Sequence, residues 1–257
     1  MLGAIIGDVI GSVHEGAGTK TKDFPLFVEG TTFTDDSVLT VAVAEWILTG
    51  RSLVDLLHSY TETYPRRGYG GMFHRWARRR VREPYNSFGN GAAMRVSPVG
   101  FAFETMEDVL AWSKRSAEVT HNHPEGIRGA QATATAIYLA RRIRDKDRIR
   151  RTIESQFEYD LSAGLDQIRP TYDFDETCQG TVPQALASFF ESSSFEDALR
   201  NAISLGGDAD TLACIAGGVA EAYYGGTPQA LAKPVIAMLD KRLVAVVDRF
   251  RERFNLL

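Results

Sequence analysis

Two long runs of small and apolar residues, each entered through an acidic cluster, place the strongest constraint on the fold of this chain. The first run follows Thr34–Ser37, which reads Thr-Asp-Asp-Ser, and the second follows Gly206–Thr211, which reads Gly-Gly-Asp-Ala-Asp-Thr. Such runs are typical of helices that are apolar on every side and therefore central in a domain. Buried carboxylates are costly without a compensating partner, so the fold must supply one for each cluster.

Two kinds of partner fit these clusters. Helix capping is the simpler one, since a threonine caps a helix N-terminus and acidic residues favour its positive end. A metal site is the other, because four carboxylates balance two divalent cations, and hard oxygen ligands suit Mg²⁺ or Mn²⁺ better than zinc. The repetition of the pattern leads us to favour a site for two divalent cations. Its candidate ligands are Thr34, Asp35, Asp36, Asp208, Asp210 and Thr211.

The rest of the chain predicts helices nearly throughout, because few segments alternate apolar and polar residues as strands do. We therefore predict one all-α domain over residues 1–257. Gly3, Gly7 and Gly11 form a stripe at intervals of four residues, which would let another helix approach closely. Residues 16–33 are expected to be a surface loop. Residues 84–100 are a second glycine-rich segment, in which turns over 87–95 lead into a helix. Helices are expected at 2–14, 35–49, 52–63, 72–82, 106–118, 125–144, 147–160, 180–191, 195–204, 209–224 and 228–254.

Composition excludes several classes of protein. The formal net charge of −4 offers no general basic field for nucleic acid. The two cysteines form no metal-binding spacing and make a disulfide framework implausible, so a reducing cytoplasm is the expected compartment and Cys214 is expected to be an inert core residue. No uncharged apolar run approaches the roughly 18 residues of a membrane span, and no signal peptide is expected.

Two further carboxylates lie near the first helix. Asp8 falls inside the apolar, glycine-striped segment, so we expect it to be buried and to anchor a loop or a helix cap. Glu15 begins the loop that follows. It is either an ordinary solvent-exposed charge or a mobile carboxylate that reaches the metal ions.

Two glycine-rich segments, Gly68–Gly71 and Ser87–Gly91, could hold phosphate oxygens through backbone N–H groups, although neither is a P-loop and most such segments are only loops. Their aromatic residues could stack on a base or pack in the core. His121 and His123 lack the neighbours that a zinc site needs, so a substrate-binding or helix-capping role is expected. The arginines of 72–82 form a solvated face or attract an anionic substrate.

Taken together and in order, these motifs resemble an ADP-ribosylglycohydrolase of the dinitrogenase-reductase-activating glycohydrolase type. The matching pieces are Gly3–Gly11 with Glu15, Phe33–Ser37, Gly68–Gly70, Gly89–Val96, Thr120–His121 and Gly206–Thr211. The resemblance implies a compact orthogonal helical bundle around a central dinuclear site of Mg²⁺ or Mn²⁺, with the six ligands named above. The hypothesis for catalysis is that Asp35 or Asp36 positions or deprotonates the attacking water, while Glu15, which matches the carboxylate on the loop that gates the site, closes over the sugar. It assigns substrate binding to Gly68, Tyr69, Gly70, Gly71, Ser87, Phe88, Gly89, Asn90, Gly91 and His121.

The expected activity is metal-dependent hydrolysis that removes ADP-ribose from a modified target, with ADP-ribosyl-arginine on a protein as the first expectation. Serine-linked ADP-ribose, O-acetyl-ADP-ribose, modified nucleic acid and small guanidine compounds remain alternative substrates. Two other classes stay open: an all-α metal-dependent phosphohydrolase, and a non-catalytic, crystallin-like member that only binds ADP-ribose. The partner is thus an ADP-ribosylated protein or small molecule, without nucleic acid or membrane, and the chain is expected to be a monomer.

Overall fold

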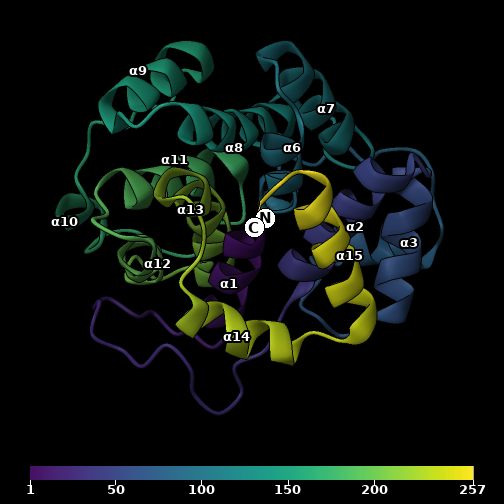
Figure 1. Ribbon diagram of the computed structural model, residues 1–257, viewed down its shortest axis with the longest axis horizontal. Coiled ribbons are helices and arrows are strands. Elements are labelled where there is room, and N and C mark those ends of the chain that lie inside the picture. Colours follow the sequence, from purple (N-terminus) through teal and green to yellow (C-terminus); the bar gives the residue numbers. More distant parts are fainter. Residues whose placement is uncertain (257) are drawn as a thin grey trace.

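The computed structural model describes residues 1–256, which form fifteen helices and no sheet (Figure 1). Among these residues the one strand-like pairing is an isolated bridge between Gly89 and Thr177. The prediction of an all-α fold is therefore confirmed. The helices are α1 (Leu2–Gly11), α2 (Asp35–Thr49), α3 (Leu53–Thr63), α4 (Gly71–Arg78), α5 (Gly91–Met94), α6 (Ser97–Ala102), α7 (Met106–Glu118), α8 (Pro124–Arg142), α9 (Lys146–Phe157), α10 (Leu165–Ile168), α11 (Cys178–Phe190), α12 (Phe195–Ile203), α13 (Ala209–Tyr224), α14 (Gln229–Met238) and α15 (Lys241–Arg253).

The two helices that follow the acidic clusters, α2 and α13, lie inside the molecule. Every residue of α13 from Ala209 to Ala222 is buried, and this helix packs against α1, α8, α11 and α12. In Figure 1, α1 and α13 occupy the centre, α2, α3 and α15 lie together on one side, and α10, α11 and α12 lie on the other. The sequence prediction that both runs are central helices is confirmed.

The glycine stripe of α1 brings its backbone against the backbone of α13. A Cβ atom added at Gly7 would lie 2.0 Å from the carbonyl oxygen of Ala213, and one added at Gly11 would lie 2.5 Å from the Cα of Asp210. No side chain fits at such distances, so only glycine allows this approach. The close packing also sets the position of Asp8 on α1 relative to Asp210 on α13.

Some predicted helix boundaries were wrong. The segment 228–254 is two helices, because Leu239 is extended and the Asp240 carboxylate caps a new helix by accepting the N–H groups of Arg242 (2.9 Å) and Leu243 (3.0 Å). The glycine-rich segment 84–100 contains the short helices α5 and α6, in keeping with turns that lead into a helix. The apolar spacing continues across Asp240, so hydrophobic periodicity alone could not reveal that one helix ends and another begins there.

Both cysteines are free and buried. Burial, reinforced by the nearby Asp36 carboxylate, raises the pKa of Cys214 well above its usual value, so its thiol stays protonated. The inert core role predicted for this residue is thus confirmed. None of the helices between residues 1 and 256 combines the length and apolar character that crossing a membrane requires.

Candidate metal and substrate site

The start of α2 is held in place by Asp8. The Asp8 carboxylate accepts hydrogen bonds from the Thr34 backbone N–H (3.0 Å), from the Thr34 hydroxyl (2.6 Å) and from the Ser37 backbone N–H (3.1 Å) and hydroxyl. Thr34 in turn caps the helix by accepting from the Asp36 N–H at 3.3 Å. The predicted anchoring role of Asp8 is confirmed, and the hydroxyl of Thr34 is engaged in the cap.

With Thr34 as the cap, the two aspartates of α2 are free for another role. Asp36 is buried; its Oδ2 accepts a hydrogen bond from the Thr211 hydroxyl at 3.3 Å, whereas its Oδ1 has no partner. A buried carboxylate oxygen without a partner carries the full cost of desolvation. Asp35 is half-buried beside Gly68, whose added Cβ would lie 3.2 Å from Asp35 Oδ1.

The start of α13 leaves its acidic residues free as well. Gly206 (φ +76°) and Gly207 (φ +69°) turn the chain in the left-handed region, and Asp208 occupies the N-cap position without capping the helix through its side chain. Instead, Asp208 Oδ2 accepts a hydrogen bond from Asn90 Nδ2 at 2.7 Å. Asp210 Oδ1 accepts the Thr211 N–H at 2.9 Å. Helix capping alone therefore does not account for the carboxylates of the second cluster.

Carboxylates from both clusters converge in two groups that could hold a metal ion. Asp8, Asp36 and Asp210 each offer an oxygen within 4.8 Å of the others, and so do Glu15, Asp208 and Asp210. Asp210 belongs to both groups, which is the arrangement expected of a carboxylate that bridges two cations. The unpartnered Asp36 oxygen and the all-oxygen donor set fit hard divalent cations. Asp35 lies outside both groups.

The electrostatics of the cluster agree with this geometry. Burial raises the pKa values of Asp36 and Asp210 well above the usual aspartate value, and repulsion from neighbouring carboxylates raises them further. The pKa of Asp35 is raised well above its usual value for the same reasons, with burial first. A bound divalent cation would offset this repulsion and would displace the protons that these carboxylates otherwise retain.

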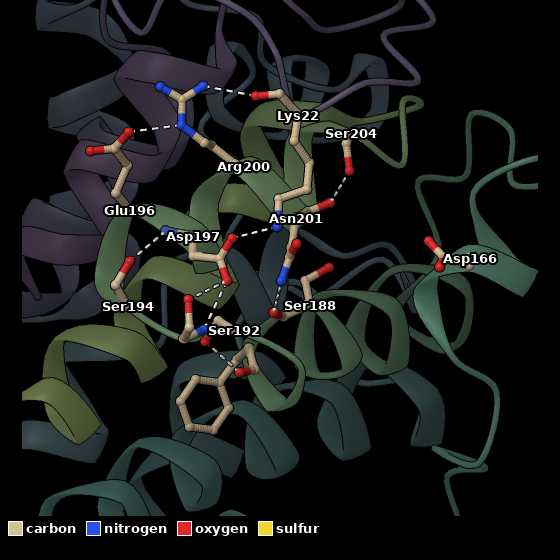
Figure 2. A network of polar contacts seen from close by, with 12 residues as sticks. Lys22, Asp166, Ser188, Ser192, Ser194, Glu196, Asp197, Arg200, Asn201 and Ser204 are labelled. Carbon is tan, nitrogen blue, oxygen red and sulfur yellow. Dashed lines mark hydrogen bonds and ion pairs between the residues drawn. The ribbon is translucent and has the colours of Figure 1, made fainter.

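The loop that carries Glu15 is fastened to α12 (Figure 2). Arg200 Nη1 donates to the backbone carbonyls of Lys22 and Phe24, each at 2.8 Å, and the Lys22 ammonium forms an ion pair with Asp197. Glu15 itself is exposed as a residue, but its carboxylate is partly buried. This partial burial, followed by repulsion from Asp208, raises the pKa of Glu15. The loop thus presents a carboxylate over the metal-binding groups while its later part stays attached to the bundle.

A cavity of about 360 Å³ opens beside these carboxylates. Of the predicted substrate-binding residues, it is lined by Gly68, Gly70, Gly71, Ser87, Gly89, Asn90, Gly91 and His121. Two predicted residues lie elsewhere. Tyr69 stacks on Phe73 and donates its hydroxyl hydrogen to the Tyr64 carbonyl at 2.9 Å, and Phe88 is 44% exposed with its ring edge-on to His123. Tyr69 therefore packs as the simpler alternative foresaw, whereas Phe88 neither packs in the core nor lines the cavity.

The cavity wall also contains residues that the sequence did not single out as site residues. Glu176 precedes α11, Arg75 lies on α4, and Arg95 lies at the end of α5. Glu176 sits in an acidic stretch that is unremarkable as sequence, so no local signal could have found it. Of the two histidines, His123 caps α8 by accepting the Glu125 N–H at 3.2 Å, whereas His121 faces the cavity.

Fold and site together define an all-α protein with a carboxylate-lined cavity suited to divalent cations and a polar ligand. Comparison with known proteins agrees. The family model for ADP-ribosylglycohydrolase matches residues 1–256, and the chain belongs to that family. It is therefore a glycohydrolase, which favours this interpretation over the phosphohydrolase alternative.

Individual relatives are distant in sequence but similar over most of the chain. The chain is 26% identical to ADP-ribosylhydrolase ARH3 of Mus musculus, over 88% of this chain and 82% of that protein. It is 32% identical to ADP-ribosylarginine hydrolase Tri1 of Pseudomonas putida, over 53% of this chain and 38% of that protein. A solved structure titled ADP-ribosylglycohydrolase-related protein complex superposes with a TM-score of 0.67 and 25% identity, covering 98% of this chain and 96% of that one.

Proposed function

We propose that this protein hydrolyses the glycosidic bond between ADP-ribose and a modified target, with two divalent cations, Mg²⁺ or Mn²⁺, as cofactors. The observation that carries the proposal is the position of Asp210, whose carboxylate belongs to both groups of converging oxygens beside the cavity. In such a site, bound cations orient sugar hydroxyls and lower the pKa of water. The residues that would hold them are Asp36, Asp208 and Asp210, which Asp8 and Glu15 join in the two groups of oxygens, with Thr34 and Thr211 as further candidate ligands. Asp35 was also predicted as a ligand but lies outside both groups.

Asp35 is the carboxylate best placed to act on water. It lines the cavity but stands outside both metal-binding groups, so its oxygens are free to face the sugar. A carboxylate at the cavity wall can act as a general base toward a water molecule. We therefore assign to Asp35 the positioning and deprotonation of the attacking water, and to Asp36 the neighbouring ligand role that orients it.

Glu15 is assigned the closing of the site over the ribose. Its carboxylate approaches Asp208 and Asp210 from the loop and lines the same cavity. Glycosidic cleavage passes through a state with positive charge on the sugar ring. A carboxylate held over the ring would stabilise that charge and exclude competing water.

The glycine-rich wall would hold the sugar diphosphate. Gly70 and Gly71 begin α4, and Gly89 and Gly91 lie where backbone approaches the cavity without side chains. The first N–H groups of α4 have no partner within the helix and can bind phosphate oxygens, whereas the Gly89 N–H donates to the Ser87 hydroxyl at 3.1 Å. Asn90 and Ser87 line the same wall, although the Asn90 amide also orients Asp208.

We propose ADP-ribosyl-arginine as the preferred linkage. Six carboxylates line the cavity: Glu15, Asp35, Asp36, Glu176, Asp208 and Asp210. Two divalent cations balance four of these charges, and the guanidinium groups of Arg75 and Arg95, which line the same cavity, balance the other two. The charges are unevenly placed, because Glu15 and Glu176 are exposed at the cavity whereas Arg95 is fully buried. Exposed carboxylates favour a positively charged guanidinium leaving group over a neutral serine hydroxyl.

A panel of linkage-defined substrates tests the function. ADP-ribosyl-arginine, ADP-ribosyl-serine and O-acetyl-ADP-ribose are incubated with the protein in Mg²⁺, in Mn²⁺ or in EDTA, and free ADP-ribose is measured. We expect release from the arginine substrate with either metal and loss of release in EDTA. Failure to cleave any substrate with either metal would refute the activity, and faster cleavage of the serine linkage would refute only the proposed preference.

Three broader expectations are kept as proposals. We propose that residues 1–257 act as one domain, that the protein is a monomer and that it works in the cytoplasm. The family match over 1–256 supports the first, and two free buried cysteines are compatible with a reducing compartment. Light scattering of the purified protein would test the oligomeric state.

A further inference from the structure

Arg95 is a fully buried cation without an acidic partner. Its side chain is 0% exposed, and no carboxylate lies within ion-pair distance among the described residues. Its Nη2 group donates to the Ser116 carbonyl and to the Thr120 hydroxyl oxygen, each at 2.8 Å. A buried charge that forms no ion pair is costly, which suggests that this guanidinium serves the cavity it borders.

The contact with Thr120 fixes the direction of the next hydrogen bond. Thr120 Oγ1 lies 2.7 Å from His121 Nδ1, and both residues are buried. A guanidinium can only donate, so the Thr120 oxygen accepts from Arg95 and keeps its own hydrogen for another partner. Among the hydrogen bonds of the described residues, His121 Nδ1 is the one acceptor in reach of it.

His121 Nδ1 must therefore be the unprotonated nitrogen, and Nε2 carries the hydrogen. The opposite tautomer would leave the Thr120 hydroxyl hydrogen without an acceptor inside the protein, which disfavours it by roughly tenfold or more. Burial first, and then the charge of Arg95, hold the pKa of His121 well below its usual value, so the ring is neutral. A neutral imidazole has one donor and one acceptor, and here their places are set.

The donor nitrogen faces the glycine wall of the cavity. A Cβ atom added at Gly91 would lie 3.1 Å from His121 Nε2, and one added at Gly89 would lie 3.6 Å from it. His121 and both glycines line the cavity. The missing side chains thus leave the Nε2–H group open toward the space where a ligand would lie.

We propose that Arg95 and Thr120 are positioning residues that fix His121 as the Nε2–H tautomer, so that it donates a hydrogen bond to an oxygen of the bound ADP-ribosyl group. The identity of the ligand rests on the proposed function, whereas the tautomer is a property of the protein alone. Arg95 acts on His121 through Thr120. Removing the Thr120 hydroxyl changes which ring nitrogen can carry the hydrogen.

Two measurements test this proposal. The first is ¹⁵N NMR of the histidine ring in the ligand-free protein, which distinguishes the tautomers by the shifts of Nδ1 and Nε2. The second is the Kd for ADP-ribose. Thr120→Val removes the hydroxyl at nearly constant volume, Thr120→Ser keeps it, and Ser116→Ala is a matched control because the Ser116 hydroxyl is buried without a hydrogen-bond partner.

We expect a single Nε2–H tautomer in the wild-type protein, in Thr120→Ser and in Ser116→Ala. Thr120→Val should give a mixture or the Nδ1–H form, with a Kd for ADP-ribose about tenfold higher. His121→Gln tests the mechanism further, since a glutamine amide reaches about the position of Nε2 without a tautomer to fix. In a His121→Gln background, Thr120→Val should therefore change Kd by less than twofold.

The outcomes separate the possible failures. An Nδ1–H tautomer in the wild-type protein would overturn the proposal without any variant. So would an unchanged tautomer and affinity in a folded Thr120→Val protein. If the tautomers behave as expected but no protein binds ADP-ribose, the ligand assignment and the proposed function fail while the positioning role of Thr120 stands.

Discussion

The contact between α1 and α13 gives a prediction whose size can be worked out from the structure. In Gly7→Ala, the new Cβ would lie 2.0 Å from the Ala213 carbonyl oxygen and 2.3 Å from its carbonyl carbon. These are backbone atoms, so no side chain can rotate away. Relief requires the two helices to separate by about 1 Å.

Such overpacking costs typically 1–3 kcal/mol, and a backbone contact places Gly7→Ala at the upper end. Alanine regains about 1 kcal/mol because it is a better helix former than glycine. The net loss of unfolding free energy is therefore about 2 kcal/mol, which lowers Tm by about 4–8 °C for a chain of this size. The shift would also move Asp8 relative to Asp210, so affinity for Mn²⁺ should fall.

Gly218→Ala is the matched control. Gly218 lies on α13, and its added Cβ would meet side-chain atoms of Ser97 at 3.3 Å and Ile137 at 3.4 Å, which can yield by a few tenths of an ångström. We expect Tm within about 2 °C of the wild-type value, because the helix gain offsets the slight crowding. Thermal unfolding followed by circular dichroism measures both variants. Equal Tm values for Gly7→Ala and the wild type, or equal losses in both variants, would refute the packing argument.

Two further predictions concern the metal and the loop. Without metal, the raised pKa values of Asp36 and Asp210 make the unfolding free energy fall as pH rises from the usual aspartate pKa through the raised values. At pH 8, Mn²⁺ at a hundred times its Kd should add about 2.7 kcal/mol to that free energy, or at least ~5 °C in Tm. The same Mn²⁺ concentration should add less at pH 5.5, because protons compete with the ion for the carboxylates. No metal-dependent shift at either pH would contradict this. Arg200→Ala removes both hydrogen bonds to the loop carbonyls, so tryptic cleavage after Lys22 should become several-fold faster. Glu196→Gln spares those two hydrogen bonds and should leave the cleavage rate unchanged. Equal cleavage rates in the two variants would show that Arg200 does not hold the loop.

Much of this architecture could be predicted because it depends on local patterns. The glycine stripe of α1 foretold a close helix–helix contact, and the apolar runs after Thr34 and Gly206 foretold central helices. Periodicity could not reveal the break at Asp240, because Leu239 and Leu243 continue the apolar spacing across it. A single capping carboxylate decided that boundary.

The site itself was less predictable, because it depends on long-range placement. The acidic clusters identified the carboxylates of α2 and α13, but only the fold brings Glu15 and Asp210 within reach of each other. Glu176 has no motif around it. The hydrogen-bond chain from Arg95 to His121 depends on rotamers and on a turn that residue types alone do not fix.

The number of metal ions held by the wild-type protein and by Asp210→Asn tests the central claim most directly. Asparagine keeps the shape of Asp210 but loses the charge that two cations would share, whereas Asp166→Asn alters an acid whose side chain is 99% exposed and serves as control. Bound Mn²⁺ per chain is measured after equilibrium dialysis, together with ADP-ribose release. We predict two ions in the wild-type and control proteins, and at most one in Asp210→Asn with hydrolysis reduced more than about 100-fold. Two ions and full hydrolysis in Asp210→Asn would contradict the bridging role and the site built on it.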